Sequence, residues 1–157
     1  TGETIHMGIL DGMEVVSIEG FESSKSLHTR LFIGRRAPIY CTAVGKAILA
    51  FLPDAVREEM VEALNLVPQT SKTITDKCAL REELEGIRSR GTSFDRGENE
   101  EGVACVGAPI FDSSGDVVAS ISISGPIFRM GEKVMAEYSD LLKEVVERIS
   151  SALGHGS

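Results

Sequence analysis

The chain has 157 residues, 42% hydrophobic and 25% charged, which suffices for one ordinary globular core. Its 16 basic against 24 acidic residues give a formal net charge of -8, which would repel a phosphate backbone, so the chain is not expected to bind DNA unaided. No apolar run reaches the roughly 18 residues needed to span a bilayer, and no leader-like segment opens the chain, so no membrane partner is expected. The three cysteines are scattered and form no C-x-x-C pair, which indicates a reduced, cytoplasmic setting.

The first part of the chain is predicted to form strands. Apolar residues alternate with polar or small ones over positions 5–9, and the turn residues Asp11-Gly12 precede a second extended run over 15–18. This pattern predicts a hairpin. Residues 27–33 are expected to form another strand, which the segment 34–38 breaks.

The middle of the chain is predicted to be helical. Apolar residues follow helical spacing over 44–51 and again over 56–64. Thr75-Asp76 is a plausible N-cap for a third helix, whose apolar stripe over 80–87 ends before Gly91.

The last third returns to strands, over 103–111 and 117–124, and closes with a long amphipathic helix. The apolar stripe of that helix is formed by Val134, Tyr138, Leu141, Val145 and Ile149. Strands, then helices, then strands predict an α+β fold with a central antiparallel sheet flanked by helices. One domain is expected over 1–153, with 154–157 a flexible tail that is native or left by an expression vector, and the chain is interpreted as part of a longer protein.

Strict alternation in Ser120-Ile121-Ser122-Ile123-Ser124 places three hydroxyls on one sheet face and two isoleucines on the other. The isoleucine face is expected to pack on helices. A buried hydroxyl without a partner costs about 1–3 kcal/mol, so the opposite face should meet either water or a polar ligand.

The register of this hairpin decides which residues join the hydroxyls. A four-residue loop at 113–116 would pair residues 112 and 117, and counting back places Cys105 opposite Ser124 and Gly107 opposite Ser122. A loop one residue shorter or longer would send Cys105 to the isoleucine face. The alternative interpretation is that Cys105 is a small buried apolar residue and the serines face water.

A second candidate site is the helix start at Thr42-Ala43-Val44-Gly45, whose unpaired backbone N–H groups and positive dipole end attract carboxylates and phosphates. It is not a nucleotide-binding P-loop, because Lys46 is followed by Ala47 and the upstream glycine is missing. An ordinary packed helix end is the alternative.

Two segments resemble the signature of the IclR family of bacterial transcription regulators: Gly91-x-x-x-Asp95-x-x-Glu98 and, six residues later, Cys105-Val106-Gly107-x-x-Ile110-Phe111-Asp112. Further segments resemble the family in the expected order, namely Gly34-Arg35-Arg36-Ala37-Pro38, Thr42-Ala43-Val44-Gly45-Lys46-Ala47, Thr73-Ile74-Thr75 and Ser122-Ile123-Ser124-Gly125-Pro126. The resemblance implies a GAF-like effector-binding domain that follows a winged helix-turn-helix domain absent here. It also implies a homodimer or homotetramer and a small organic acid as ligand.

Carried across by position, the family's pocket maps to the side chains of Asp95, Cys105, Ser122 and Ser124 and to the backbone N–H groups of Ala43 and Val44. Thr29 and Gly107 are expected as further lining, and if Thr29 points inward the pocket is more polar than in the family's apolar-lined relatives. Arg96 and Gly97 depart from the acidic residues that commonly follow the aspartate of this motif. The leading expectation is therefore an allosteric sensor that reaches operator DNA only through the absent domain, with no cofactor.

Two other functions stay open at this point. An enzyme could use Cys105 as nucleophile, His28 as base and Asp95 to orient it, and a ligand-free dimerisation module could use the long last helix. The acidic cluster Glu98, Glu100 and Glu101 could suggest a metal site, but a solvated loop is expected instead, and no metal is predicted.

Overall fold

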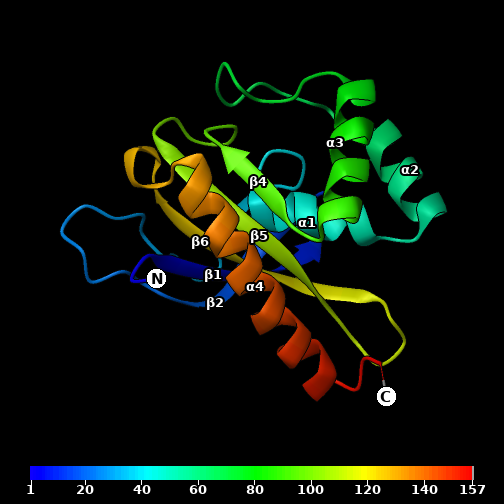
Figure 1. Ribbon diagram of the computed structural model, residues 1–157. Helices are drawn as coiled ribbons and strands as arrows, with labels where there is room; N and C mark the ends of the chain where they lie inside the picture. The colour runs from blue at the N-terminus through cyan, green and yellow to red at the C-terminus, as the bar shows by residue number, and fades with distance from the viewer. Residues whose placement is uncertain (157) are drawn as a thin grey trace.

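The computed structural model describes residues 1–156 and shows an α+β domain built on one six-stranded antiparallel sheet (Figure 1). The strand order across the sheet is β3-β2-β1-β6-β5-β4, so the first and last strands of the chain pair at its centre. The strands are β1 (Thr4–Asp11), β2 (Glu14–Phe21), β3 (Arg36–Pro38), β4 (Ser93–Arg96), β5 (Val103–Phe111) and β6 (Val117–Pro126). The predicted fold class is confirmed, whereas the short edge strand β4 was not predicted.

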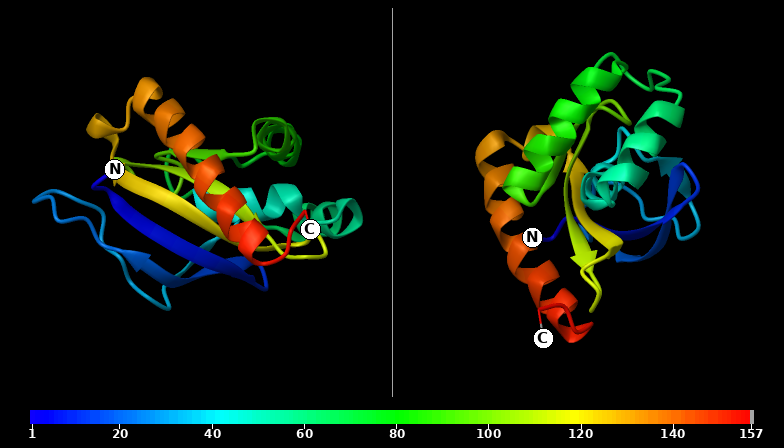
Figure 2. Two further views of the ribbon diagram at one scale, coloured as in Figure 1. Left: turned by 60° about the horizontal axis from the view of Figure 1, so that its bottom comes forward. Right: turned by 90° about the vertical axis from the view of Figure 1, so that its right-hand side faces the viewer.

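Helices cover both faces of this sheet. They are α1 (Ala43–Phe51), α2 (Asp54–Ala63), α3 (Lys77–Arg90) and α4 (Glu132–Ala152), with a short 3-10 turn η1 (Ile127–Arg129) before α4. Figure 2 shows α4 crossing one face while α1 lies against the other. Asp76 caps α3 as predicted, its side chain accepting a hydrogen bond from the amide of Ala79, and the helix ends at Gly91 in the left-handed conformation.

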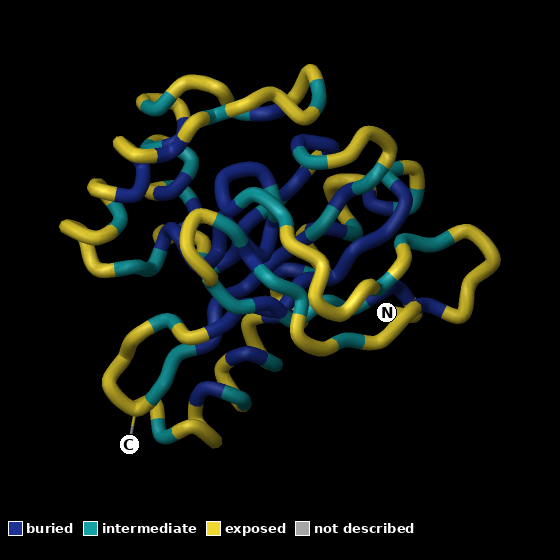
Figure 3. The backbone as a smooth tube through the Cα atoms, turned by 180° about the vertical axis from the view of Figure 1, so that it is seen from behind, coloured by how far each residue is buried: buried dark blue, intermediate teal, exposed yellow. Residues whose placement is uncertain are grey.

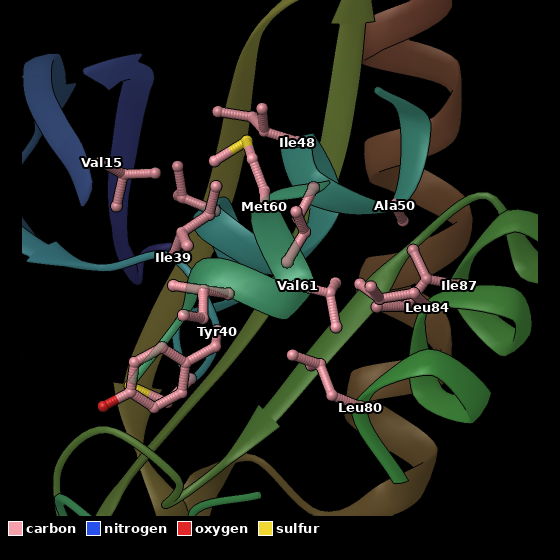
Figure 4. Close-up of a cluster of buried hydrophobic side chains, with 14 residues drawn as sticks. Val15, Ile39, Tyr40, Ile48, Ala50, Met60, Val61, Leu80, Leu84 and Ile87 are labelled. Atoms are coloured by element: carbon pink, nitrogen blue, oxygen red, sulfur yellow. The ribbon is translucent and has the colours of Figure 1, made fainter. Parts of the chain in front are cut away.

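The larger apolar core surrounds α1 and reaches α2 and α3 (Figure 4). Every residue of α1 from Ala43 to Ala50 is buried, which is the pattern expected of a helix packed on all sides. Leu80, Leu84 and Ile87 of α3 are fully buried in the same core, so the predicted stripe is confirmed. This packing holds the start of α1 rigidly over the sheet.

The hairpin register agrees with the prediction where it bears on the site. Cys105 pairs with Ser124 and Gly107 pairs with Ser122, and both isoleucines of β6 share a core cluster with Met135 and Leu142 of α4. At the loop end the prediction was wrong, because a bulge makes residue 111, not 112, the partner of residue 117. The bulge absorbs one residue without changing which face Cys105 occupies.

The predicted strand over 27–33 was wrong. These residues form no ladder and belong to the long connection 22–35, which extends away from the sheet, while β3 pairs with β2 instead (Figure 1). The connection is held by side chains: Thr29 Oγ1 donates to the carbonyl of Ser124 at 3.1 Å, and Thr4 Oγ1 donates to the carbonyl of Thr29 at 2.5 Å. The residues that resemble a strand in the sequence line a cavity, described below, and do not pair with a neighbouring strand.

The buried face of α4 is offset from the predicted stripe. The buried residues are Met135, Ser139, Leu142, Val146 and Ser150, whereas Leu141 is exposed and the other predicted members are half-buried. One residue corresponds to a rotation of about 100° around the helix. The two buried serines find partners, because Ser139 Oγ pairs with Thr92 Oγ1 at 2.7 Å and Ser150 Oγ accepts from the amide of Phe111 at 3.0 Å. Hydropathy alone could not show these partners.

Burial follows the layers, with the centre of the sheet dark and the peripheral connections largely exposed in Figure 3. After α4, His155 stacks on Phe111 with ring centroids 5.2 Å apart, and the predicted tail residue Ser157 lies outside the described residues. Within residues 1–156, no helix combines the length and apolarity that crossing a membrane requires.

Candidate ligand-binding site

A cavity of about 670 Å³ lies between the hydroxyl face of the sheet, the start of α1 and the 22–35 connection. It brings together residues from segments far apart in the chain. The sequence-predicted residues that line it are Thr29, Ala43, Val44, Asp95, Cys105, Ser122 and Ser124. A cavity of this size falls within the range of small-molecule sites.

Gly107 was expected to line the cavity, and the structure contradicts this. A Cβ atom placed on Gly107 would lie 2.6 Å from the carbonyl oxygen of Ala43 and 2.7 Å from Ser93 Oγ. Ser93 Oγ donates a hydrogen bond to that same carbonyl at 2.5 Å. The glycine therefore serves to let α1 approach the sheet closely, so that the first turn of the helix reaches the cavity.

The start of α1 presents unpaired donors to the cavity. Thr42 is the N-cap, and its side chain accepts a hydrogen bond from the amide of Gly45 at 3.1 Å. The amides of Ala43 and Val44 lie in the first turn of the helix, where no carbonyl of the same helix can accept their hydrogen bonds. Within residues 1–156 no other group accepts from them. Two N–H groups and the positive end of the helix dipole thus face the same space as Ser122 and Ser124.

Asp95 lies on β4 directly beside Cys105 and is only 3% exposed. Its Oδ1 atom accepts a hydrogen bond from the amide of Glu98 at 2.7 Å, which fixes the carboxyl at the cavity wall. Burial is the largest cause of its shifted pKa, and the nearby Glu98 carboxylate adds to it, raising the pKa of Asp95 from 3.8 to about 7. This carboxyl can therefore be protonated or ionised near neutral pH.

A buried ion pair behind the cavity was missed by sequence reasoning. Lys46, 1% exposed, donates from Nζ to both carboxylate oxygens of Glu98, at 2.9 and 2.7 Å, and to the carbonyl of Phe94 at 2.6 Å. The expectation of a solvated loop was wrong for Glu98, which is buried, and holds for the exposed Glu100 and Glu101. Lys46 is the one charged residue in an otherwise apolar helix, and that is the signal that could have pointed to a buried partner.

No group of three histidine, cysteine or carboxylate side chains within 1–156 is placed to hold a metal ion.

Cys105 lacks the environment of a catalytic nucleophile. Cys105 Sγ donates to Ser124 Oγ at 3.1 Å, and burial raises the pKa of the thiol, which keeps it protonated. The His28 ring instead contacts the carbonyl of Lys25 at 2.5 Å and a Glu22 carboxylate oxygen at 3.2 Å.

Further polar residues that were not predicted as site residues also line the cavity. They include His6 on β1, Ser17 on β2, Arg35 just before β3, and Arg30, Asn99 and Glu100. The alternation of β1 held the signal for His6, because its apolar residues face α4 and the residues between them must face the other side. No comparable local signal exists for Arg35, which reaches the cavity through the path of the connection.

The family assignment rests on comparisons with known proteins. Residues 1–151 match the family model described as bacterial transcriptional regulator IclR, C-terminal. The chain belongs to the IclR family. It is 37% identical over 155 residues to the HTH-type transcriptional regulator KdgR of Escherichia coli K12, a match that covers 99% of this chain and 59% of that protein.

Solved IclR-family structures have the same fold. The Thermotoga maritima IclR structure superposes with a TM-score of 0.94 at 45% identity, covering 99% of this chain and 63% of that one. The C-terminal domain of E. coli KdgR superposes with a TM-score of 0.88 at 37% identity, covering 99% of this chain and 90% of that one. These relatives are named as transcription regulators, and the family model that matches this chain describes the C-terminal part of such regulators.

Proposed function

We propose that this IclR-family domain binds a small organic acid in the cavity beneath α1 and thereby changes the operator affinity of a DNA-binding domain that lies outside this chain. One observation carries the proposal: the unpaired amides of Ala43 and Val44 face the same cavity as the hydroxyls of Ser122 and Ser124. Hydrogen-bond donors that converge on one part of a cleft are the usual form of a carboxylate site.

In this arrangement the ligand carboxylate lies against the two α1 amides, where the helix dipole stabilises its charge. Ser122 and Ser124 donate to its oxygens, and Cys105 contributes a small volume and an S–H group that donates to Ser124 Oγ and so leaves the Ser124 hydroxyl proton for the ligand. Asp95, at the far side of Cys105, accepts from a hydroxyl group of the ligand or, when protonated, donates to a carbonyl oxygen. A small hydroxy or oxo acid satisfies all of these groups.

Regulation then requires that the ligand bind two arrangements of the protein with different affinity. The start of α1 is the element that senses the ligand. Its first turn contacts the cavity and the rest of the helix packs in the core, so a shift of the first turn on ligand binding moves the core contacts of the helix as well. A homodimer or homotetramer, proposed here from the family resemblance, supplies the two arrangements, and operator DNA is reached through the DNA-binding domain alone.

The test removes one donor while preserving the helix. Ala43 occupies the first position of α1, where proline is well tolerated because its missing N–H has no intrahelical acceptor. Calorimetry with small hydroxy and oxo acids, chosen by a thermal-shift screen, should show carboxylate affinity about tenfold weaker in Ala43→Pro than in the unsubstituted chain.

Lys77→Pro is the matched control, because it places proline at the equivalent position of α3, away from the cavity. That variant should bind with unchanged affinity. A folded Ala43→Pro variant that binds carboxylates as well as the parent chain would overturn the proposed placement. Absence of binding by any acid would favour a dimerisation module without ligand.

A further inference from the structure

The hydroxyl face of the sheet continues past the serines to two more strands. His6 on β1 pairs with Ser122, while Gly8 on β1 lies between Ser120 on one side and Ser17 on β2 on the other. The cavity lining includes His6 and Ser17 as well as Arg35. These three residues, called here the distal cluster, extend the polar floor of the cavity away from Asp95 and toward β2.

The distal cluster is held in place by the backbone. The amide of Ser17 donates to the carbonyl of Arg35 at 2.9 Å, and the amide of Gly34 donates to the carbonyl of Ser17 at 2.7 Å. These two bonds fasten the end of the 22–35 connection to β2, so that the Arg35 side chain begins at a defined point beside the cavity. The guanidinium group of Arg35 lies 5.9 Å from the ring centroid of Phe32, another lining residue.

The polar groups of the distal cluster lack partners in the part of the chain that the structure describes. Ser17 Oγ and Ser120 Oγ are both buried without a hydrogen-bond partner, and of these two serines only Ser17 belongs to the residues that line the cavity. Arg35 is exposed and forms no ion pair, so its charge is free to bind an anion, whereas its neighbour Arg36 is paired with both Asp11 and Glu14. Unpartnered donors gathered at one end of a cavity indicate that a ligand group belongs there.

The charge of the distal cluster selects the kind of group. Burial and the nearby Arg35 cation lower the pKa of His6, so the histidine is neutral at pH 7 and the positive charge comes from the arginine. The lining carboxylates, Asp95 and Glu100, belong to β4 and the loop that follows it, on the other side of β5, β6 and β1. An anionic group is therefore favoured at the β2 end.

We infer that the distal cluster is a second subsite, which binds the far anionic group of an elongated acid whose first carboxylate lies at α1; this rests on the proposed function. Ser122 and Ser17 stand on strands two positions apart and are offset by two residues along them, because Ser122 pairs with His6 and Ser17 with Gly8. At the usual strand spacing and rise this separation is roughly 12 Å. The favoured ligand class is therefore an α,ω-dicarboxylate or a similarly extended acid, and not an acid of two or three carbons.

The experiment compares adipate with hexanoate, which has the same chain length and a single carboxylate. Calorimetry of the unsubstituted chain should show adipate binding about tenfold or more tightly, as expected for a charge-assisted hydrogen-bonded pair. Arg35→Gln should reduce that preference to about twofold or less while leaving hexanoate affinity unchanged. Arg36→Gln, which removes the adjacent but paired cation, should keep the preference.

A second variant tests the unpartnered hydroxyl. Ser17→Ala should weaken adipate binding relative to hexanoate and should not lower the free energy of unfolding, because the lost hydroxyl has no protein partner. Equal affinity of the parent chain for adipate and hexanoate, or loss of the preference in Arg36→Gln, would overturn the distal subsite alone. Failure of both acids to bind would also overturn the distal subsite, whereas the proposed function fails only if the small hydroxy and oxo acids of the first experiment do not bind either.

Discussion

The carboxyl of Asp95 should make this domain less stable at neutral pH than its amide counterpart. Its pKa in the folded chain is about 7, against 3.8 as the ordinary value. Between those values the folded state keeps a proton that the unfolded state has lost, so stability falls as the pH rises through this window and stays low above it. A difference of about 3 pKa units corresponds to roughly 4 kcal/mol at full effect.

Asp95→Asn removes that cost, because an amide cannot ionise and its Oδ1 can still accept from the amide of Glu98. The free energy of unfolding should therefore rise by roughly 2–4 kcal/mol at about pH 8, and by progressively less toward pH 5. Urea denaturation across this pH range measures the difference directly. Asp116→Asn, in the exposed loop between β5 and β6, is the control for replacing a carboxylate by an amide and should give a small difference.

Two results would refute this reasoning. A stability difference between Asp95→Asn and the parent chain that is the same at every pH would show that the carboxyl does not titrate in this window. A variant less stable than the parent at about pH 8 would show that the hydrogen bonding of the ionised carboxylate outweighs the cost of burial. If the effect is present, this position retains a costly acid, as is typical of residues kept for binding.

Two further predictions concern the frame of the cavity. Glu3, 5% exposed and paired with Arg129 at 2.8 Å, has its pKa lowered to about 2. The ionised Glu3 carboxylate therefore stabilises the folded state fully above its ordinary pKa, and this stabilisation is lost as the pH falls toward 2. Glu3→Gln should lower the free energy of unfolding by about 2–3 kcal/mol at pH 7 but by little near pH 2, as measured by urea denaturation. Gly107→Ala should lower the free energy of unfolding by about 1–3 kcal/mol, because the added Cβ forces Ala43 away from the sheet, and thermal unfolding measures this loss. Gly131→Ala is the control and should cost little, because its added Cβ meets open space. Equal losses from the two glycine variants would contradict the packing role of Gly107.

Local periodicity was sufficient to predict much of this fold. The alternation in residues 120–124 placed the hydroxyls and isoleucines on opposite faces. The predicted pairing of Cys105 with Ser124 is observed, although a bulge compensates for a loop that is one residue longer than predicted. Such features depend on neighbours in sequence, because a strand has a fixed period of two and a tight loop leaves few registers. The residues that could be predicted to gather around the cavity, Asp95 among them, came from those patterns and from the family resemblance.

Tertiary structure alone decided the rest. The segment 27–33 has the composition of a strand, yet it lies across the cavity because β3 occupies the neighbouring edge of β2. Lys46 and Glu98 are buried as a pair, although each by itself would be expected in solvent. A buried charge or a cavity-lining side chain is stable only when residues distant in the chain complete its partners, and no local pattern records which residues those are.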